Sequence, residues 1–160
     1  MRCECGARVL ELLSCSDCGE AFLAGYGVKD SRSEFLLPSA VTLSNLPDDA
    51  DTTKHAGSYR LYWPTQTNAP IDKQKKASTE KPGGEKSSVS YSFQETLLNP
   101  ALGELQSPRP GRTSMTGFVY RVQEGNDEAP GLPFWCPQCG ADRRVNSKSL
   151  SASYIRSPLT

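Results

Sequence analysis

Apolar and polar residues alternate along several short stretches of the chain, and this pattern predicts β-strands rather than long helices. The stretch 59–63 (YRLYW) alternates cleanly, and 116–123 (TGFVYRVQ) is the best strand candidate in the second half. Residues 7–14 and 20–28 predict the two strands of a hairpin with residues 15–19 at its tip. The short apolar run in 7–14 would also permit one helical turn, but the cysteine turns around it favour a strand.

Other stretches carry a weaker strand pattern. Residues 34–43 (EFLLPSAVTL) contain Pro38, which limits them to an edge strand or two short pieces. Residues 89–93 (VSYSF) resume strand character, whereas 94–105 are ambiguous because a proline and a glycine limit any helix. The expected fold is therefore small, mostly β and irregular, with zinc-ribbon-like antiparallel hairpins and long flexible loops.

Residues 64–88 are expected to form a disordered loop. This segment contains one isoleucine and no aromatic residue, so it buries too little apolar surface to offset the entropy of ordering it. The whole chain has 160 residues, of which only 36% are hydrophobic, with 13 glycines and 12 prolines. A core this small usually needs an additional stabilising element, and a bound metal ion is the obvious one.

The cysteines supply a pattern typical of metal binding. The chain contains one Cys-x-Cys turn, at 3–5, and two Cys-x-x-Cys turns, at 15–18 and 136–139. A glycine directly follows each of them. Such a turn points both thiolates at one ion, and the glycine tolerates the positive φ that tightens it. The candidate ligands of a structural Zn²⁺ are Cys15, Cys18, Cys136 and Cys139, together with Cys3 and Cys5.

Six cysteines make one four-thiolate site and half of another, so the sequence leaves the pairing open. The favoured site joins Cys15 and Cys18 to Cys136 and Cys139, because both pairs have two-residue spacing. Alternatively, Cys3 and Cys5 complete a compact site with Cys15 and Cys18, or form half of a second site whose other half is outside this chain. A disulfide framework is the remaining alternative, disfavoured because no secretion signal precedes the cysteines.

The charge and composition of the chain reduce the number of function classes to consider. The 18 basic and 18 acidic residues cancel, which removes a global electrostatic argument for nucleic-acid binding. No transmembrane run or signal peptide is visible, so a cytoplasmic protein without membrane contact is expected. An all-thiolate site has no open position for catalysis, and the single histidine, His55, lies in an acidic stretch. We therefore assign no catalytic and no cofactor-binding residues beyond the metal ligands.

Two further features, a glycine-rich stretch and the aromatic residues, could suggest a binding site, but the sequence does not favour one at either. The sequence GGEKS at 83–87 lacks the adjacent Gly-Lys-Ser/Thr of a phosphate-binding loop. The aromatic residues are more often core than a stacking surface for bases, since no basic patch accompanies them. They are Tyr26, Tyr59, Tyr62, Trp63, Phe118, Tyr120, Phe134 and Trp135.

The first 26 residues resemble a zinc-binding segment carried inside bacterial DEAD/DEAH-box helicases of superfamily 2, including helicases of phage-defence systems. The resemblance lies in the pattern RCxCGxRVLEL, then CxxCGE, then FLxGY, and more weakly in the later CPQCG and YIRSPLT. It implies a non-catalytic zinc module of an ATP-dependent enzyme that acts on DNA or RNA. The chain carries no Walker A loop and no DExH box, so it resembles a fragment without the motor domains.

These observations give the expected organisation. Residues 1–142 would form the zinc-ribbon-like β domain, and the basic segment 143–160 would lead toward an absent domain. The expected function is a structural zinc module that assists engagement of nucleic acid or of a partner. The alternative is an independent zinc-ribbon adaptor that binds another protein.

Overall fold

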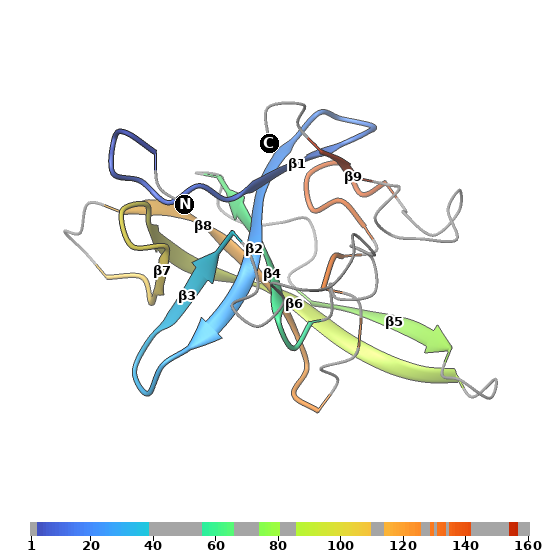
Figure 1. The fold of residues 1–160 in the computed structure, drawn as a ribbon. Helices are drawn as coiled ribbons and strands as arrows, with labels where there is room; N and C mark the ends of the chain where they lie inside the picture. Colours follow the sequence, from blue (N-terminus) through green and yellow to red (C-terminus); the bar gives the residue numbers. More distant parts are fainter. Residues whose placement is uncertain are drawn as a thin grey trace, which may run out of the picture.

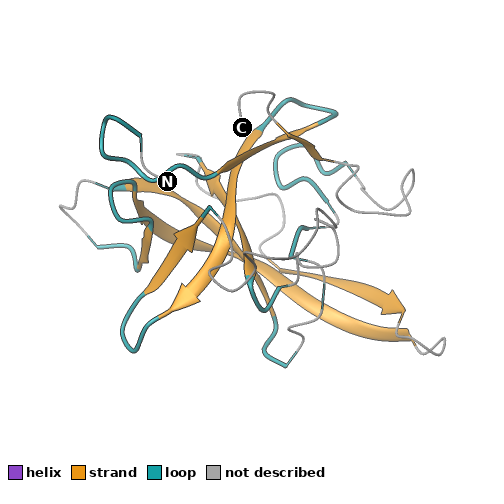
Figure 2. Ribbon diagram, viewed as in Figure 1, coloured by secondary structure: helices purple, strands orange, loops and turns teal. Residues whose placement is uncertain are grey.

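The computed structural model describes residues 3–38, 56–65, 74–80, 86–109, 114–125, 129, 131–133, 135–141 and 154–156. These residues form nine β-strands and no helix (Figures 1 and 2). The strands are β1 (Glu11–Cys15), β2 (Ala21–Lys29), β3 (Glu34–Leu37), β4 (Tyr59–Pro64), β5 (Gln74–Glu80), β6 (Lys86–Asn99), β7 (Glu104–Gln106), β8 (Met115–Val122) and β9 (Tyr154–Arg156). The predicted small, irregular, mostly-β fold is confirmed.

All nine strands belong to one antiparallel sheet that closes on itself. The pairings run β2–β3–β7–β6–β8–β4 and return to β2. β2 allows this closure because it has two different neighbours along one edge. Its first half pairs with β1 and its second half with β3, while β4 lies along the other edge. The β1–β2 hairpin therefore extends from the ring and carries its tip beyond it (Figure 1).

The structure follows the predicted hairpin and the two best strand candidates closely. β1 and β2 pair with Ser14 opposite Ala21, so residues 15–20 form the turn. β4 and β8 occupy the predicted stretches, and β3 ends at Leu37, next to the proline that was expected to interrupt it. His55 lies outside the described residues, as does most of the acidic stretch around it, residues 46–57.

One expectation needs correction, and the structure resolves one ambiguous stretch. The segment 64–88, expected to be a loop, contains β5 and the first residues of β6, which pair from Gln74↔Ser92 to Glu80↔Lys86. The stretch 94–105, left ambiguous, continues β6 to Asn99 and then turns into β7. In both cases backbone pairing with a long neighbouring strand supplies hydrogen bonds that side-chain composition does not reveal. The predicted boundary at residue 142 stays a prediction.

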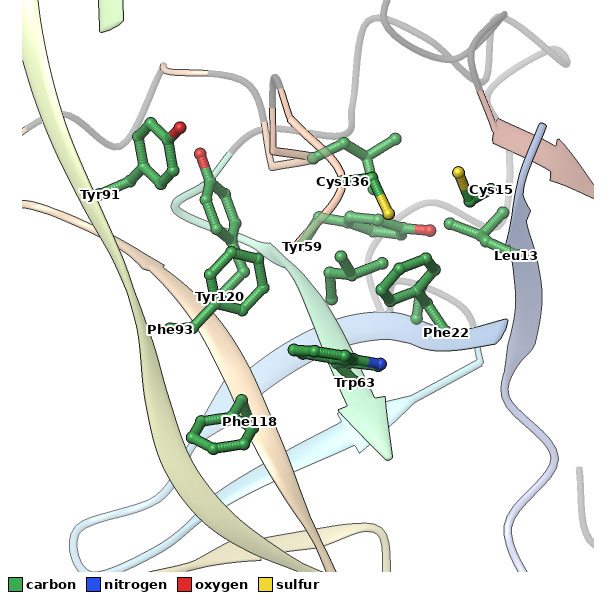
Figure 3. Packing of buried hydrophobic residues seen from close by; sticks show 13 residues of the cluster. Leu13, Cys15, Phe22, Tyr59, Trp63, Tyr91, Phe93, Phe118, Tyr120 and Cys136 are labelled. Carbon is green, nitrogen blue, oxygen red and sulfur yellow. The ribbon is translucent and has the colours of Figure 1, made fainter. Parts of the chain in front are cut away.

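The core lies on both faces of the sheet, and β4 shows why. Tyr59, Leu61 and Trp63 point to one face, where they join the larger hydrophobic cluster (Figure 3). Tyr62 points to the opposite face, toward the smaller cluster inside the closed sheet. Strand residues alternate between faces, so a strand buried on both sides carries apolar or aromatic residues on both of its faces. The smaller cluster consists of Leu36, Tyr62, Leu98, Leu105 and Val119.

A partly buried ion cluster crosses three strands of the ring. Glu34 on β3 accepts from Arg60 Nε on β4 at 3.0 Å and from Arg121 on β8 at 2.5 Å. Arg60 is only 8% exposed, and its guanidinium also donates to the backbone oxygens of Ala56 and Tyr59. Burial alone would raise the pKa of Glu34, but the two arginines outweigh it and hold the pKa below its ordinary value.

We expect Glu34→Gln to destabilise the fold by about 1–3 kcal/mol at neutral pH, because it leaves Arg60 buried without its charged partner. The folded-state pKa of Glu34 is depressed, so its contribution is complete above the ordinary value of 4.5. The contribution is lost as the pH falls through the lower, folded-state pKa. Urea unfolding of both proteins between neutral and acidic pH should measure this loss. The difference in the free energy of unfolding between wild type and Glu34→Gln should become smaller as the pH falls. An advantage independent of pH would contradict the ion-pair assignment.

Candidate metal centre

The first half of the candidate centre is the turn at the tip of the β1–β2 hairpin. Cys15 is the last residue of β1, and its amide donates to Glu20 O at 2.8 Å. The Gly19 amide donates to Cys15 O at 2.9 Å, which requires the positive φ of 75° that Gly19 adopts. The Cys18 amide points at Cys15 Sγ, 3.4 Å away. The turn therefore aims backbone N–H groups at a sulfur, which stabilises a thiolate.

The second half is the turn 136–140, which repeats this arrangement. The Gly140 amide donates to Cys136 O at 2.9 Å, the Cys136 amide donates to Ala141 O at 3.1 Å, and Gly140 has a φ of 74°. The turn is docked on the outer face of the sheet by neighbouring apolar residues. Leu132 and Cys136 are part of the larger core cluster, and Trp135 stacks on Tyr91 with 6.0 Å between ring centroids. Packing against β6 thus positions the last cysteine pair.

The structure brings these two turns together. The sulfurs of Cys15 and Cys139 lie 3.8 Å apart, and those of Cys18 and Cys136 also lie 3.8 Å apart. All four sulfurs lie within 4.8 Å of one another. Cys15 and Cys136 are buried, and their side chains lie at the margin of the core beside Leu13 and Tyr59 (Figure 3). Cys18 and Cys139 are exposed, so the cluster sits at the surface with one side closed by the core. These four cysteines lie close enough to hold a metal ion.

The pKa values of Cys15, Cys18 and Cys136 are shifted in different directions. Burial alone would raise the pKa of Cys15, but hydrogen bonds from the Cys18 and Asp17 amides outweigh it and lower the pKa to about 7. Burial raises the pKa of Cys136, which lies near Cys15 and Cys139, and the pKa of Cys18 is also raised, first by burial. Four thiolates at these separations repel one another, so full deprotonation needs a positive charge between them. A divalent cation supplies that charge.

Cys3 and Cys5 lie outside this cluster. Within the described part of the chain, the one group of three or more potential ligands is formed by Cys15, Cys18, Cys136 and Cys139. The alternative in which Cys3 and Cys5 complete a site with the hairpin turn is therefore wrong for this structure, because the hairpin turn faces the last turn instead. A metal role for Cys3 and Cys5 stays a prediction. All six cysteines are free thiols, which does not match a disulfide framework.

Most of the aromatic candidates are core residues. Tyr59, Tyr62, Trp63, Phe118 and Tyr120 are buried, as the structural interpretation of the sequence predicted. Tyr26 and Trp135 are partly buried against the same cluster, and Phe134 lies outside the described residues. Sequence reasoning missed the cluster of Glu34, Arg60 and Arg121, since residues so far apart in sequence show no local pattern.

With a closed antiparallel sheet and a surface cluster of four cysteines, the chain is a small β module whose cysteines lie close enough to hold a metal ion. The chain belongs to the YjiV N-terminal domain family, whose model matches residues 1–156. No curated protein and no solved structure was found to match the chain. Among the described residues, no helix has the length and apolar character needed to cross a membrane.

Proposed function

We propose that Cys15, Cys18, Cys136 and Cys139 bind one structural Zn²⁺ and that the zinc-stapled domain is a non-catalytic module of a larger nucleic-acid enzyme. The spacing of the sulfurs carries the first part. A tetrahedron of four sulfurs about 2.3 Å from a zinc ion has edges of about 3.8 Å. Two of the edges in this cluster measure 3.8 Å, one between Cys15 and Cys139 and one between Cys18 and Cys136.

The donor set favours zinc among the common metals. Hard cations such as Mg²⁺ and Ca²⁺ select oxygen ligands, whereas four thiolates suit zinc or iron–sulfur chemistry. The ion would have no vacant position for a water or a substrate, so its role would be structural. Its effect on the fold is large because the paired turns lie 118 and 124 residues apart in sequence, measured between the contacting cysteines. Bridging them closes a long loop that the unfolded chain otherwise leaves open.

The second part of the proposal, a link to nucleic acid, rests on the sequence resemblance to the zinc-binding segment of superfamily 2 helicases. The family description as an N-terminal domain is compatible with a module that works beside other domains. ATP binding and hydrolysis would belong to those domains. The resemblance also supports a cytoplasmic location, where thiolates stay reduced and available to zinc.

A protein-binding adaptor is the second candidate, favoured by the neutral charge of the chain. The two candidates differ in their response to nucleic acid. A module with few basic contacts should bind DNA or RNA weakly, with an affinity that falls by a log–log slope of about 0.9 for each phosphate contact. An adaptor should not bind nucleic acid at any salt concentration.

Titrating labelled single-stranded and duplex DNA and RNA into the zinc-loaded protein at two salt concentrations tests this proposal. We expect weak binding that salt abolishes. We expect Arg109→Ala to reduce both the affinity and the salt slope, because residues 106–120 contain Arg109 and Arg112 and no acidic residue, whereas Lys29 is followed by Asp30. Arg109 is exposed, and Lys29→Ala, an exposed cation at the end of β2, is the matched control. Absence of binding at low salt would reject the nucleic-acid role and leave the adaptor. Tight binding that is insensitive to salt would contradict both candidates.

A further inference from the structure

The turn that contains Cys3 and Cys5 has the same backbone design as the two turns of the candidate metal centre. The Cys5 amide points at Cys3 Sγ, 3.4 Å away, as the Cys18 amide points at Cys15 Sγ. The Gly6 amide donates to Cys3 O at 2.9 Å and the Cys3 amide donates to Ala7 O at 2.8 Å. Gly6 has a φ of 85°. The turn is one residue shorter than the others but otherwise repeats their hydrogen bonds.

This turn is attached firmly to the sheet although its cysteines are exposed. The amide of Arg8 donates to Pro100 O at 2.8 Å, and its Nε donates to Leu102 O at 3.2 Å. Both acceptors belong to the connection between β6 and β7. These hydrogen bonds fix the turn on the sheet, and its two cysteines are exposed. Such a turn offers two preorganised thiol ligands to an external ion.

An all-thiolate site needs two more sulfurs, and the other four cysteines of these 160 residues gather in the cluster already described. Within the described residues, no group of three or more potential ligands includes Cys3 or Cys5. An identical turn from a second copy supplies two more sulfurs. A twofold axis through the ion exchanges the two pairs and is compatible with a tetrahedron.

We propose that Cys3 and Cys5 are half of a second zinc site, which the Cys3 and Cys5 of a second copy complete, so that one zinc bridges a dimer. The bridging site shares the metal chemistry of the proposed function but none of its ligands. It predicts 1.5 zinc ions per chain, one internal and half of a shared one. The stoichiometry of metal and the mass of the protein therefore report on it together.

The test measures zinc content and solution mass by light scattering for the full chain, with a thiol reductant present throughout. We expect a dimer with 1.5 zinc per chain. The double variant Cys3→Ser/Cys5→Ser should be a monomer with 1.0 zinc, and its thermal melt should stay cooperative because the internal zinc is retained. The matched control Glu4→Ala changes the exposed residue between the two cysteines and should remain a dimer, because it keeps both sulfurs. A mild chelator that leaves the internal zinc in place should dissociate the wild-type dimer.

The outcomes separate this inference from the proposed function. A wild-type monomer with 1.0 zinc would overturn the bridging site and leave the internal zinc intact. A monomer with 2.0 zinc would also overturn it, because the second ion would then be completed within the chain. A dimer that persists in the double variant would show that other surfaces hold the copies together. Protein without zinc would reject both sites.

Discussion

Replacing Cys136 by serine should release the internal zinc and abolish cooperative unfolding of the domain. Cys136 is buried, and its sulfur lies 3.8 Å from that of Cys18 on the hairpin turn. Structural zinc sites contribute an apparent binding free energy of about 10–16 kcal/mol. The whole stability of a typical domain is about 5–15 kcal/mol, so the domain should not tolerate the loss.

A comparison of three cysteine variants tests which turns share the ion, which the loss of stability in one variant does not. Cys15→Ser and Cys136→Ser should be equally damaging, since they remove ligands of one ion from opposite ends of the chain. Cys3→Ser should lower the melting temperature much less than either of these variants, because that thiol is exposed and lies outside the cluster. Thermal melts and zinc analysis of the three variants provide the measurement. A severe Cys3→Ser together with a mild Cys136→Ser would show that the turns pair differently.

Trp63→Ala should cost about 3–5 kcal/mol, the usual range for truncating a large buried aromatic side chain. Trp63 is 1% exposed and lies at the centre of the larger cluster, with ring centroids of Phe22, Phe93 and Phe118 at 6.0–6.4 Å. Its indole Nε1 also donates to Glu20 Oε1 at 2.9 Å. Since Glu20 is the last residue of the hairpin turn, the variant should also lower the affinity for zinc.

Chemical denaturation of the zinc-loaded protein measures this cost. Trp63→Phe, which keeps an aromatic ring but loses the indole donor, should cost clearly less than the alanine variant. Val28→Ala is the surface control, because Val28 is 40% exposed on the same sheet, and it should change stability by less than about 0.5 kcal/mol. If Trp63→Ala resembled the surface control, the described core would be wrong.

The local parts of this structure could be predicted from the sequence. The turns at Cys15 and Cys136 are specified by two cysteines and a glycine within five residues, and both have the expected positive-φ glycine. β4 and β8 could be predicted because their apolar residues have strand periodicity. The apolar and aromatic character of 59–63 reflects burial on both faces, which is a consequence of the closed sheet.

The long-range parts could not be predicted in the same way. β5 has a polar sequence and owes its place to backbone pairing with β6. The closure of the sheet depends on β2 changing neighbours halfway along its length, which no local pattern encodes. The choice between the possible cysteine pairings depended on the same topology. It is the docking of Leu132 and Cys136 on the outer sheet face that brings the last turn to the hairpin tip.

We expect one zinc ion to join the hairpin turn near the start of the chain to the turn at 136–140 through four sulfurs. X-ray absorption at the zinc edge of the Cys3→Ser/Cys5→Ser variant tests it most directly, because that variant retains just the four clustered cysteines. We expect a single shell of four sulfurs at about 2.3 Å and no nitrogen or oxygen ligand. A shell with fewer sulfurs, completed by lighter ligands, would contradict the account, as would protein purified under reducing conditions that contains no zinc.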